Sequence, residues 1–133
     1  MIEFQIEVSS EVANEISYIL DNEPGEWVIM DEDTADKQAR EYILDSVWAF
    51  NMDFLSSHLK IETSPRIKKS LTLLCETLCE DANDILLALI KDEDRFVQEA
   101  IALDGRAHFM SAYDGKEVEI CVGGKWFLAY RMN

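Results

Sequence analysis

The chain has 133 residues and a formal net charge of −15, because 27 acidic side chains stand against only 12 basic ones. Such a surface repels nucleic acid and anionic membranes, which excludes both as direct partners and makes a cationic protein surface its natural complement. An apolar fraction of 48% with thirteen aromatic residues is too high for a disordered chain. The length suits one hydrophobic core, so we predict a single globular domain over residues 1–133.

The N-terminal residues predict a strand, a helix and a second strand. Apolar and polar side chains alternate over residues 2–8, a pattern typical of a strand with one buried face. Ser9 or Ser10 can cap a helix over residues 12–20, where apolar residues recur every three or four positions. Residues 26–30 follow a Pro-Gly pair and are rich in β-prone side chains, which predicts the second strand.

The middle of the chain predicts helices. A long helix should open at Asp33 or Thr34, because its apolar stripe continues to residue 55 without an interior glycine or proline. Ser64, followed directly by a proline, marks the start of another helix. Two further helices are predicted over residues 82–91 and 93–103.

The C-terminal residues predict a loop and then a hairpin. Residues 106–115 are polar and bounded by glycines, which indicates a loop. Residues 117–122 and 125–131 flank Gly123 and Gly124, whose freedom at positive φ suits a two-residue hairpin turn. We therefore predict an α+β fold, in which N-terminal strands and a C-terminal hairpin form a small antiparallel sheet packed against four to five helices.

Four short stretches resemble small bacteriophage proteins of unassigned function. They are residues 45–51 (DSVWAFN), 104–109 (DGRAHF), 113–115 (YDG) and 130–133 (YRMN). The similarity covers roughly residues 41–133, leaves the N-terminal segment outside, and brings no catalytic residue with it. It implies a phage origin and action in the cytoplasm of a bacterial host. For a small, very acidic phage protein, we expect inhibition of a nucleic-acid-binding host defence, of the anti-CRISPR or anti-restriction type.

The first 36 residues contain eleven carboxylates and no lysine or arginine. Carboxylates held at separations comparable to those of phosphates can occupy a basic nucleic-acid-binding groove. We therefore predict a non-enzymatic inhibitor without a cofactor, which docks on a basic host protein as a nucleic-acid mimic or by diffuse attraction. The predicted partner-binding residues are Glu3, Glu7, Glu11, Glu15, Asp21, Glu23, Glu26, Asp31, Glu32, Asp33 and Asp36.

Two alternatives stay open. In the first, the chain is a phage accessory or dimerisation domain whose charge serves only solubility, and a homodimer is compatible with its apolar content. In the second, it is a ligand binder or enzyme that uses Arg106, His108, Tyr113 and Asp114, which place a cation, an imidazole, a phenol and a carboxylate within nine residues. No nucleophile motif or phosphate loop supports catalysis.

No metal site is predicted. Residues 31–33 and 92–94 are dense in carboxylates, but neither stretch continues into an EF-hand loop, and both suit helix N-termini. Cys75 and Cys79 share a helix face, yet zinc needs two further ligands. We expect reduced thiols in a cytoplasm, because the cysteines are three in number and no signal sequence is recognised. No apolar run is long enough to span a bilayer.

Overall fold

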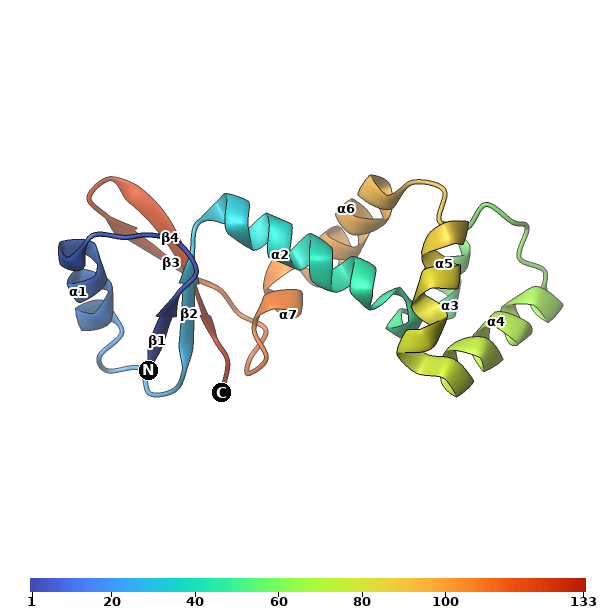
Figure 1. The fold of residues 1–133 in the computed structure, drawn as a ribbon, viewed down its shortest axis with the longest axis horizontal. Helices are drawn as coiled ribbons and strands as arrows, with labels where there is room; N and C mark the ends of the chain where they lie inside the picture. Colours follow the sequence, from blue (N-terminus) through green and yellow to red (C-terminus); the bar gives the residue numbers. More distant parts are fainter. The chain divides into compact units, whose positions relative to one another are not determined.

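The computed structural model describes residues 1–133, which divide into two compact units. Unit 1 comprises residues 1–39 and 104–133, and unit 2 comprises residues 40–103. In chain order, the elements drawn in Figure 1 are β1 (Ile2–Phe4), α1 (Ser10–Ile19), β2 (Trp27–Met30), α2 (Glu32–Asp45), η1 (Val47–Ala49), α3 (Met52–Ser56), α4 (Pro65–Leu78), η2 (Cys79–Ala82), α5 (Asn83–Leu89), α6 (Glu93–Asp104), α7 (Arg106–Met110), β3 (Val118–Val122) and β4 (Lys125–Arg131). The predicted α+β class is confirmed.

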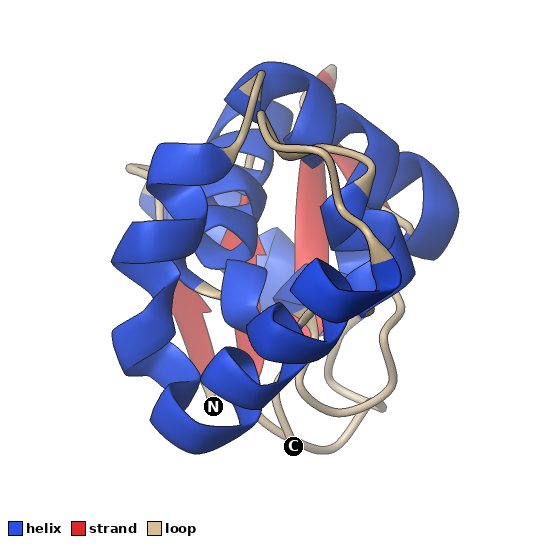
Figure 2. Ribbon diagram, turned by 90° about the vertical axis from the view of Figure 1, so that its right-hand side faces the viewer, coloured by secondary structure: helices blue, strands red, loops and turns tan.

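The four strands form one sheet in the order β1-β2-β4-β3, drawn in red in Figure 2. The N-terminal strands and the C-terminal hairpin thus share a sheet, as predicted, and β4 pairs antiparallel with both β2 and β3. The sheet is mixed rather than wholly antiparallel, because β1 and β2 run parallel with Phe4 beside Ile29. The cause is α1, which crosses over between the two strands and returns the chain to the end of the sheet where β1 began.

Both faces of the sheet are covered by helices of unit 1. Ile16 of α1 packs with Ile29 and other apolar strand residues on one face. Ala35 of α2 packs with Tyr130 on the other, where the α7 residue Met110 adds to the cluster. Figure 1 shows α1 on one side of the strands and the first turns of α2 on the other. Successive side chains of a strand point to opposite faces, so β2 and β4 contribute apolar residues to both clusters.

The two termini meet at one end of this sheet (Figure 1). The Met1 ammonium donates to the Gly25 carbonyl at 3.3 Å, and the Glu26 amide donates to the Asn133 side chain at 3.0 Å. Gly25 has a φ of +125°, and a side chain there would meet the Asn133 carbonyl oxygen. Glycine is therefore required where the N-terminal and C-terminal strands come together.

The strand boundaries differ from prediction mainly at the N-terminus. The predicted strand over residues 2–8 is shorter, because β1 ends at Phe4. Ile6 and Val8 nevertheless pack against the same core as β1, which explains why the alternating pattern continues beyond it. The hairpin follows prediction closely, with Gly123 at φ +60° and Gly124 at φ +78° in its turn.

The long helix predicted from Asp33 to residue 55 is wrong beyond Asp45. The chain breaks there into α2, the short 3-10 turn η1 and α3. The buried side chain of Asn83 donates to the Leu44 carbonyl at 2.7 Å and accepts from the Trp48 amide at 3.3 Å. It satisfies backbone groups that a continuous helix would pair internally, so the break leaves none of them orphaned.

The other predicted helices are confirmed within a few residues. Ser64 caps α4 by accepting from the Ile67 amide, and Asp92 caps α6 by accepting from the Arg95 amide. The predicted loop over residues 106–115 is partly helical, since its first five residues form α7. None of the helices combines the length and apolar character that crossing a bilayer requires.

Candidate functional site

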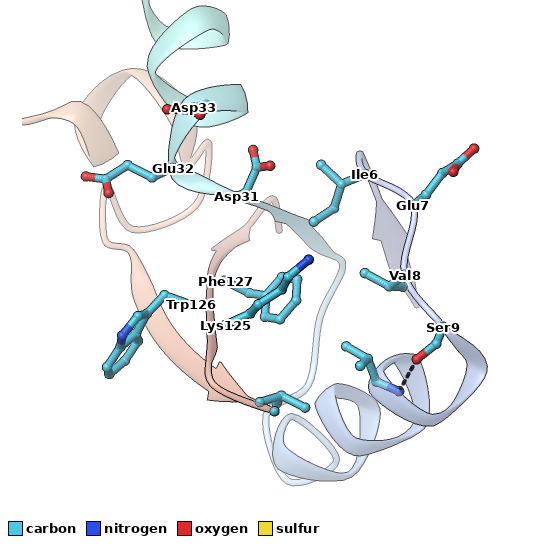
Figure 3. A pocket seen from close by; sticks show the side chains of 13 residues that line it. Ile6, Glu7, Val8, Ser9, Asp31, Glu32, Asp33, Lys125, Trp126 and Phe127 are labelled. Carbon is cyan, nitrogen blue, oxygen red and sulfur yellow. Dashed lines mark hydrogen bonds between the residues drawn. The ribbon is translucent and has the colours of Figure 1, made fainter.

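An open groove of about 870 Å³ lies at the end of the sheet opposite the two termini (Figure 3). β1 and β2 are parallel, so the acidic residues that follow each strand reach the same edge. Glu7 comes from the chain after β1, and residues 31–33 come from the chain after β2. Four of the predicted partner-binding residues, Glu7, Asp31, Glu32 and Asp33, therefore line one groove.

The floor of the groove is apolar. Figure 3 shows Ile6 and Val8 turned into it, with Phe127 of β4 across from them behind the Lys125 side chain. Lys125, at the start of β4, is the one cation of the lining, against four carboxylates. The groove is thus a hydrophobic trough with a net negative rim, a combination that fits the aliphatic stem and charged end of a lysine or arginine side chain.

Asp31 is fixed in place because it starts α2. Its Oδ1 accepts from the Thr34 amide at 2.8 Å, which satisfies one of the free amides at the helix N-terminus. Hydrogen bonds from the Thr34 side chain and amide lower the pKa of Asp31, with a smaller contribution from Lys125. The Asp31 carboxylate therefore stays ionised well into mild acid and presents a fixed negative charge to the groove.

Trp126 is the large aromatic side chain beside the acids. It is 63% exposed and projects from the hairpin away from Phe127, because neighbouring residues of a strand point to opposite faces. It also lines a second hollow of about 250 Å³ together with Glu32 and Arg106. An exposed tryptophan at an acidic rim is the kind of side chain that anchors protein interfaces.

The remaining seven predicted partner-binding residues lie elsewhere on unit 1. Glu11 and Glu15 are exposed on α1, while Glu3 lies on the opposite face of the sheet, because Ile2 and Phe4 share the core with α1. The other four are Asp21, Glu23 and Glu26 in the connection before β2, and Asp36 on α2. The acids therefore surround the sheet at both ends, and they form one cluster only at the groove.

Most of the N-terminal acids have no cationic partner. Nine of the eleven have no lysine, arginine or histidine nitrogen within 4.0 Å. The two exceptions are Asp36 and Glu32, whose carboxylates lie 2.6 Å and 3.6 Å from the Arg106 guanidinium. Glu7, Asp31 and Asp33 of the groove are therefore unneutralised by ion pairs.

Arg106, predicted as part of a ligand or catalytic site, is occupied by structural partners. Its guanidinium is 15% exposed and donates to both carboxylate oxygens of Glu117, at 3.1 and 2.9 Å. The Tyr130 hydroxyl donates to the same carboxylate at 2.6 Å. Burial opposes ionisation of Glu117, but the bonds from Arg106 and Tyr130 outweigh it and lower its pKa. Burial and the neighbouring Glu117 raise the pKa of Tyr130, so this cluster is ionised at Glu117 and neutral at Tyr130.

The other three residues proposed with Arg106 each have partners of their own. The Arg131 guanidinium lies over the Tyr113 ring, 3.9 Å from its centre. Asp114 lies 3.0 Å from the Ser111 hydroxyl and belongs to a turn. His108 is exposed on α7, and its ring contacts that of Phe109 edge-on at a centroid distance of 5.0 Å. The chain thus brings these residues into one neighbourhood without joining them by hydrogen bonds into a catalytic arrangement.

A further polar site surrounds His58 in unit 2, a residue that is not among the predicted site residues. It is 6% exposed, and its Nε2 lies 2.7 Å from a Glu99 carboxylate oxygen. A hydrogen bond from Arg95 and the nearby imidazole lower the pKa of Glu99. Phe54 and Phe96 enclose the imidazole, at centroid distances of 4.9 and 5.2 Å. Helical spacing from Phe54 indicates burial of His58, but sequence spacing cannot pair it with a residue 41 positions away.

No three His, Cys, Asp or Glu side chains gather closely enough to hold a metal ion. No family model, curated protein or solved structure matches the chain. The interpretation of the groove therefore depends on its own chemistry. Its apolar floor and its carboxylates suit the aliphatic stem and the charged end of a basic side chain.

Proposed function

We propose that this chain is a non-enzymatic binding protein whose acidic groove docks on a cationic surface of another protein. The observation that carries the proposal is the convergence of Glu7 with the acidic residues 31–33 around an apolar floor that holds one lysine. A lysine or arginine of the partner would lay its aliphatic stem on Ile6 and Val8 and place its charge between the carboxylates. Trp126 would add apolar contact at the edge.

The distribution of charge between the two units also favours docking through unit 1, which contains the groove. Unit 1 holds fifteen acidic and five basic side chains, a net charge of −10, whereas unit 2 carries −5. A strongly negative body attracts a cationic partner over a distance of about one Debye length, roughly 10 Å at 0.1 M salt, and accelerates encounter. Attraction of this kind acts mainly on the association rate, while the groove and Trp126 would determine the lifetime of the complex.

In its narrower form, suggested by the resemblance to phage proteins, the partner is a nucleic-acid-binding complex of bacterial host defence. The carboxylates would then cover lysines and arginines that otherwise contact phosphates, and nucleic acid and this chain would compete for one surface. Docking would block access without any chemical step. An anti-CRISPR or anti-restriction role follows from this form of the proposal.

The first test compares variants that each remove three negative charges. The groove variant is Glu7→Gln, Asp31→Asn and Asp33→Asn, in which asparagine preserves the helix cap. A second variant, Asp21→Asn, Glu23→Gln and Glu26→Gln, alters the other end of the sheet. Partners captured from a bacterial lysate at about 50 mM salt are identified by mass spectrometry, and their affinity is measured up to about 500 mM. We expect at least about tenfold weaker binding for the groove variant only.

The control for net charge is Asp45→Asn, Glu62→Gln and Asp84→Asn, three exposed acids of unit 2 without ion pairs. Equal losses for all three variants would show that overall charge, rather than the groove, drives binding. Binding that is insensitive to salt and to all three variants would refute charge-driven docking altogether.

The narrower form has its own assay. A restriction or CRISPR nuclease that the chain captures should lose cleavage activity when the chain is in excess, and added nucleic acid should relieve the inhibition. The groove variant should inhibit at least about tenfold less well than the control variant of unit 2. Inhibition that nucleic acid does not relieve would place the docking surface away from the nucleic-acid-binding groove.

A further inference from the structure

Helix α4 carries apolar side chains on a face that nothing in the structure covers. Its inward residues Leu71 and Cys75 are buried, but Leu73 is 63% exposed, and Ile67 and Leu78 are also exposed. A shallow hollow of about 380 Å³ follows the outer face and is lined by Ser70, Leu73, Leu74, Thr77 and Leu78. The lining contains no charged residue and three leucines, so this uncharged flank of an exposed helix points to a binding surface.

The charges around this flank are divided between the two ends of α4. The first turns contain three basic residues and no acidic one, namely Arg66, Lys68 and Lys69. The last turn and the following η2 contain three acidic residues and no basic one, namely Glu76, Glu80 and Asp81. Only Lys68 forms an ion pair, with Asp53 at 3.3 Å. Five of the six charges are therefore free to meet a partner.

This arrangement opposes the dipole of α4. A helix is stabilised by acidic side chains near its N-terminus and basic ones near its C-terminus, and α4 has the reverse at both ends. The charges therefore increase the polarity of the helix instead of reducing it. A second helix lying antiparallel would offset the mismatch at both ends at once, because it would place acids beside the basic end and bases beside the acidic end.

We propose that α4 is a self-association surface, on which the α4 of a second copy of this chain packs antiparallel about a two-fold axis near Leu73. In that register Leu73 meets its own copy at the centre, and Ser70 and Thr77 are small enough to let the helices approach. Lys69 of each copy then lies against Glu76 of the other, with Arg66 near the acidic turn that follows the helix. One surface supplies both halves of the charge complementarity, as an isologous dimer requires.

The expected dimer is weak. α4 has 14 residues and is about 21 Å long, so a single helix face buries less area than a standard protein interface. We expect a dissociation constant of about 10 to 100 µM. The net charge of −15 makes two copies repel each other at long range, and about 0.15 to 0.3 M salt screens that repulsion while the close apolar contact persists.

The decisive experiment inverts the charge at one end of α4 at a time. Arg66→Glu with Lys69→Glu gives a helix that is acidic at both ends, and Glu76→Lys with Glu80→Lys gives one that is basic at both ends. Sedimentation equilibrium of the full chain between about 1 and 500 µM should show each variant to be monomeric on its own. An equimolar mixture should form a heterodimer at least as tight as the wild-type dimer.

Both double variants bring α4 into better agreement with its dipole, so a loss of dimer in either cannot be ascribed to unfolding. Circular dichroism melting checks this directly. A wild-type chain that remains monomeric up to about 500 µM would overturn the proposal. So would homodimers of either variant as tight as wild type, or a mixture that does not associate.

The apolar centre is tested by Leu73→Glu, which should weaken the dimer at least about a hundredfold because both copies carry the buried charge. The matched control is Leu103→Glu, which makes the same change at a leucine of α6 that is 71% exposed. The control should dimerise like wild type. Equal weakening by both substitutions would assign self-association to general surface hydrophobicity instead of α4.

The direction of packing is tested by disulfide cross-linking in a background of Cys79→Ser and Cys121→Ser, which removes the exposed native thiols. Leu73→Cys should cross-link under mild oxidation, because the two-fold axis brings the two thiols together. Thr77→Cys should not, since antiparallel helices place the two Thr77 residues on opposite sides of the central Leu73 pair, about 12 Å apart along the helix axis. Cross-linking of both variants would indicate parallel helices and overturn the proposed arrangement.

Discussion

The Arg106 guanidinium joins segments of unit 1 that are far apart in the sequence. It bonds Glu117 through two nitrogens and Asp36, 70 residues away, through the third. Glu117 also accepts from the Tyr130 hydroxyl on β4. The network therefore connects α2 and α7 with the hairpin beside the groove. Loss of one partner would leave a poorly hydrated charge behind, which costs more than the bond itself contributes.

Glu117→Gln should lower the free energy of unfolding by about 2 kcal/mol at neutral pH, because the Arg106 charge loses its bidentate partner. The structure also predicts how this stability difference changes with pH. The pKa of Glu117 is lowered from 4.5 on folding, so its contribution is present above pH 4.5 and is lost as the pH falls through the folded-state pKa. The difference between variant and wild type should therefore shrink in acid.

Urea unfolding of both proteins between about pH 7 and pH 3 measures this difference. Glu119→Gln, at an exposed position of β3 without an ion pair, is the matched control and should change the stability little at any pH. A gap between Glu117→Gln and wild type that stays constant down to the acid end would contradict the assignment to the ionised carboxylate.

At the scale of elements, helix starts depend on single side chains. Asp31→Ala should lower the free energy of unfolding by about 1 kcal/mol, because the Thr34 amide loses its acceptor at the start of α2. Asp33→Ala, at the second residue of the same helix, removes the same charge without removing a cap and should cost less. Thermal unfolding followed by circular dichroism compares the two. Equal losses would mean that charge near the helix dipole, and not the cap, is what Asp31 supplies.

Local signals predicted most of the elements. Ser9, Ser64 and Asp92 each accept a backbone hydrogen bond at the start of a helix, and a cap is recognisable from its immediate neighbours. Paired glycines predicted the hairpin for the same reason. The break after Asp45 was not predictable in this way, because it depends on Asn83, which reaches it from 39 residues further along the chain.

The candidate site was predictable in its composition but not in its geometry. The sequence identified Glu7 and residues 31–33 as acids in a segment without basic residues, and these line the groove. Their convergence requires β1 and β2 to be parallel, whereas an antiparallel sheet was predicted. The ion pair between Arg106 and Asp36 was not predictable either, because no local sequence pattern relates two residues that meet only through the packing of α7 beside α2.

At the scale of the whole molecule, the chain crosses twice between its compact units, within α2 and at the end of α6. Unit 1 contains both termini, and unit 2 is inserted between its two segments. Within unit 1, Asp36 and Arg106 are in contact, so the points where the chain leaves and returns lie close together. The single-domain prediction for residues 1–133 and the division into units make different predictions for a shortened chain.

Replacement of residues 40–103 by a glycine-serine linker of about six residues should leave unit 1 folded, because its sheet and both flanking clusters are made within it. Circular dichroism and the dispersion of amide signals by NMR measure this. The shortened chain should retain salt-sensitive binding through the groove and remain monomeric, since it lacks α4. A chain that is unfolded without unit 2 would instead support one cooperative domain over all 133 residues.

The meeting of Met1 and Asn133 at one end of the sheet has a practical consequence for measuring such binding. The groove lies at the other end, so a biotin or fluorescent dye attached at Asn133 would be separated from it by the length of the strands. A sensor surface that holds the molecule by this residue would leave Asp31 and Trp126 facing the solution. Immobilisation through lysines would block the groove in those molecules that are attached by Lys125, because this residue lies inside it.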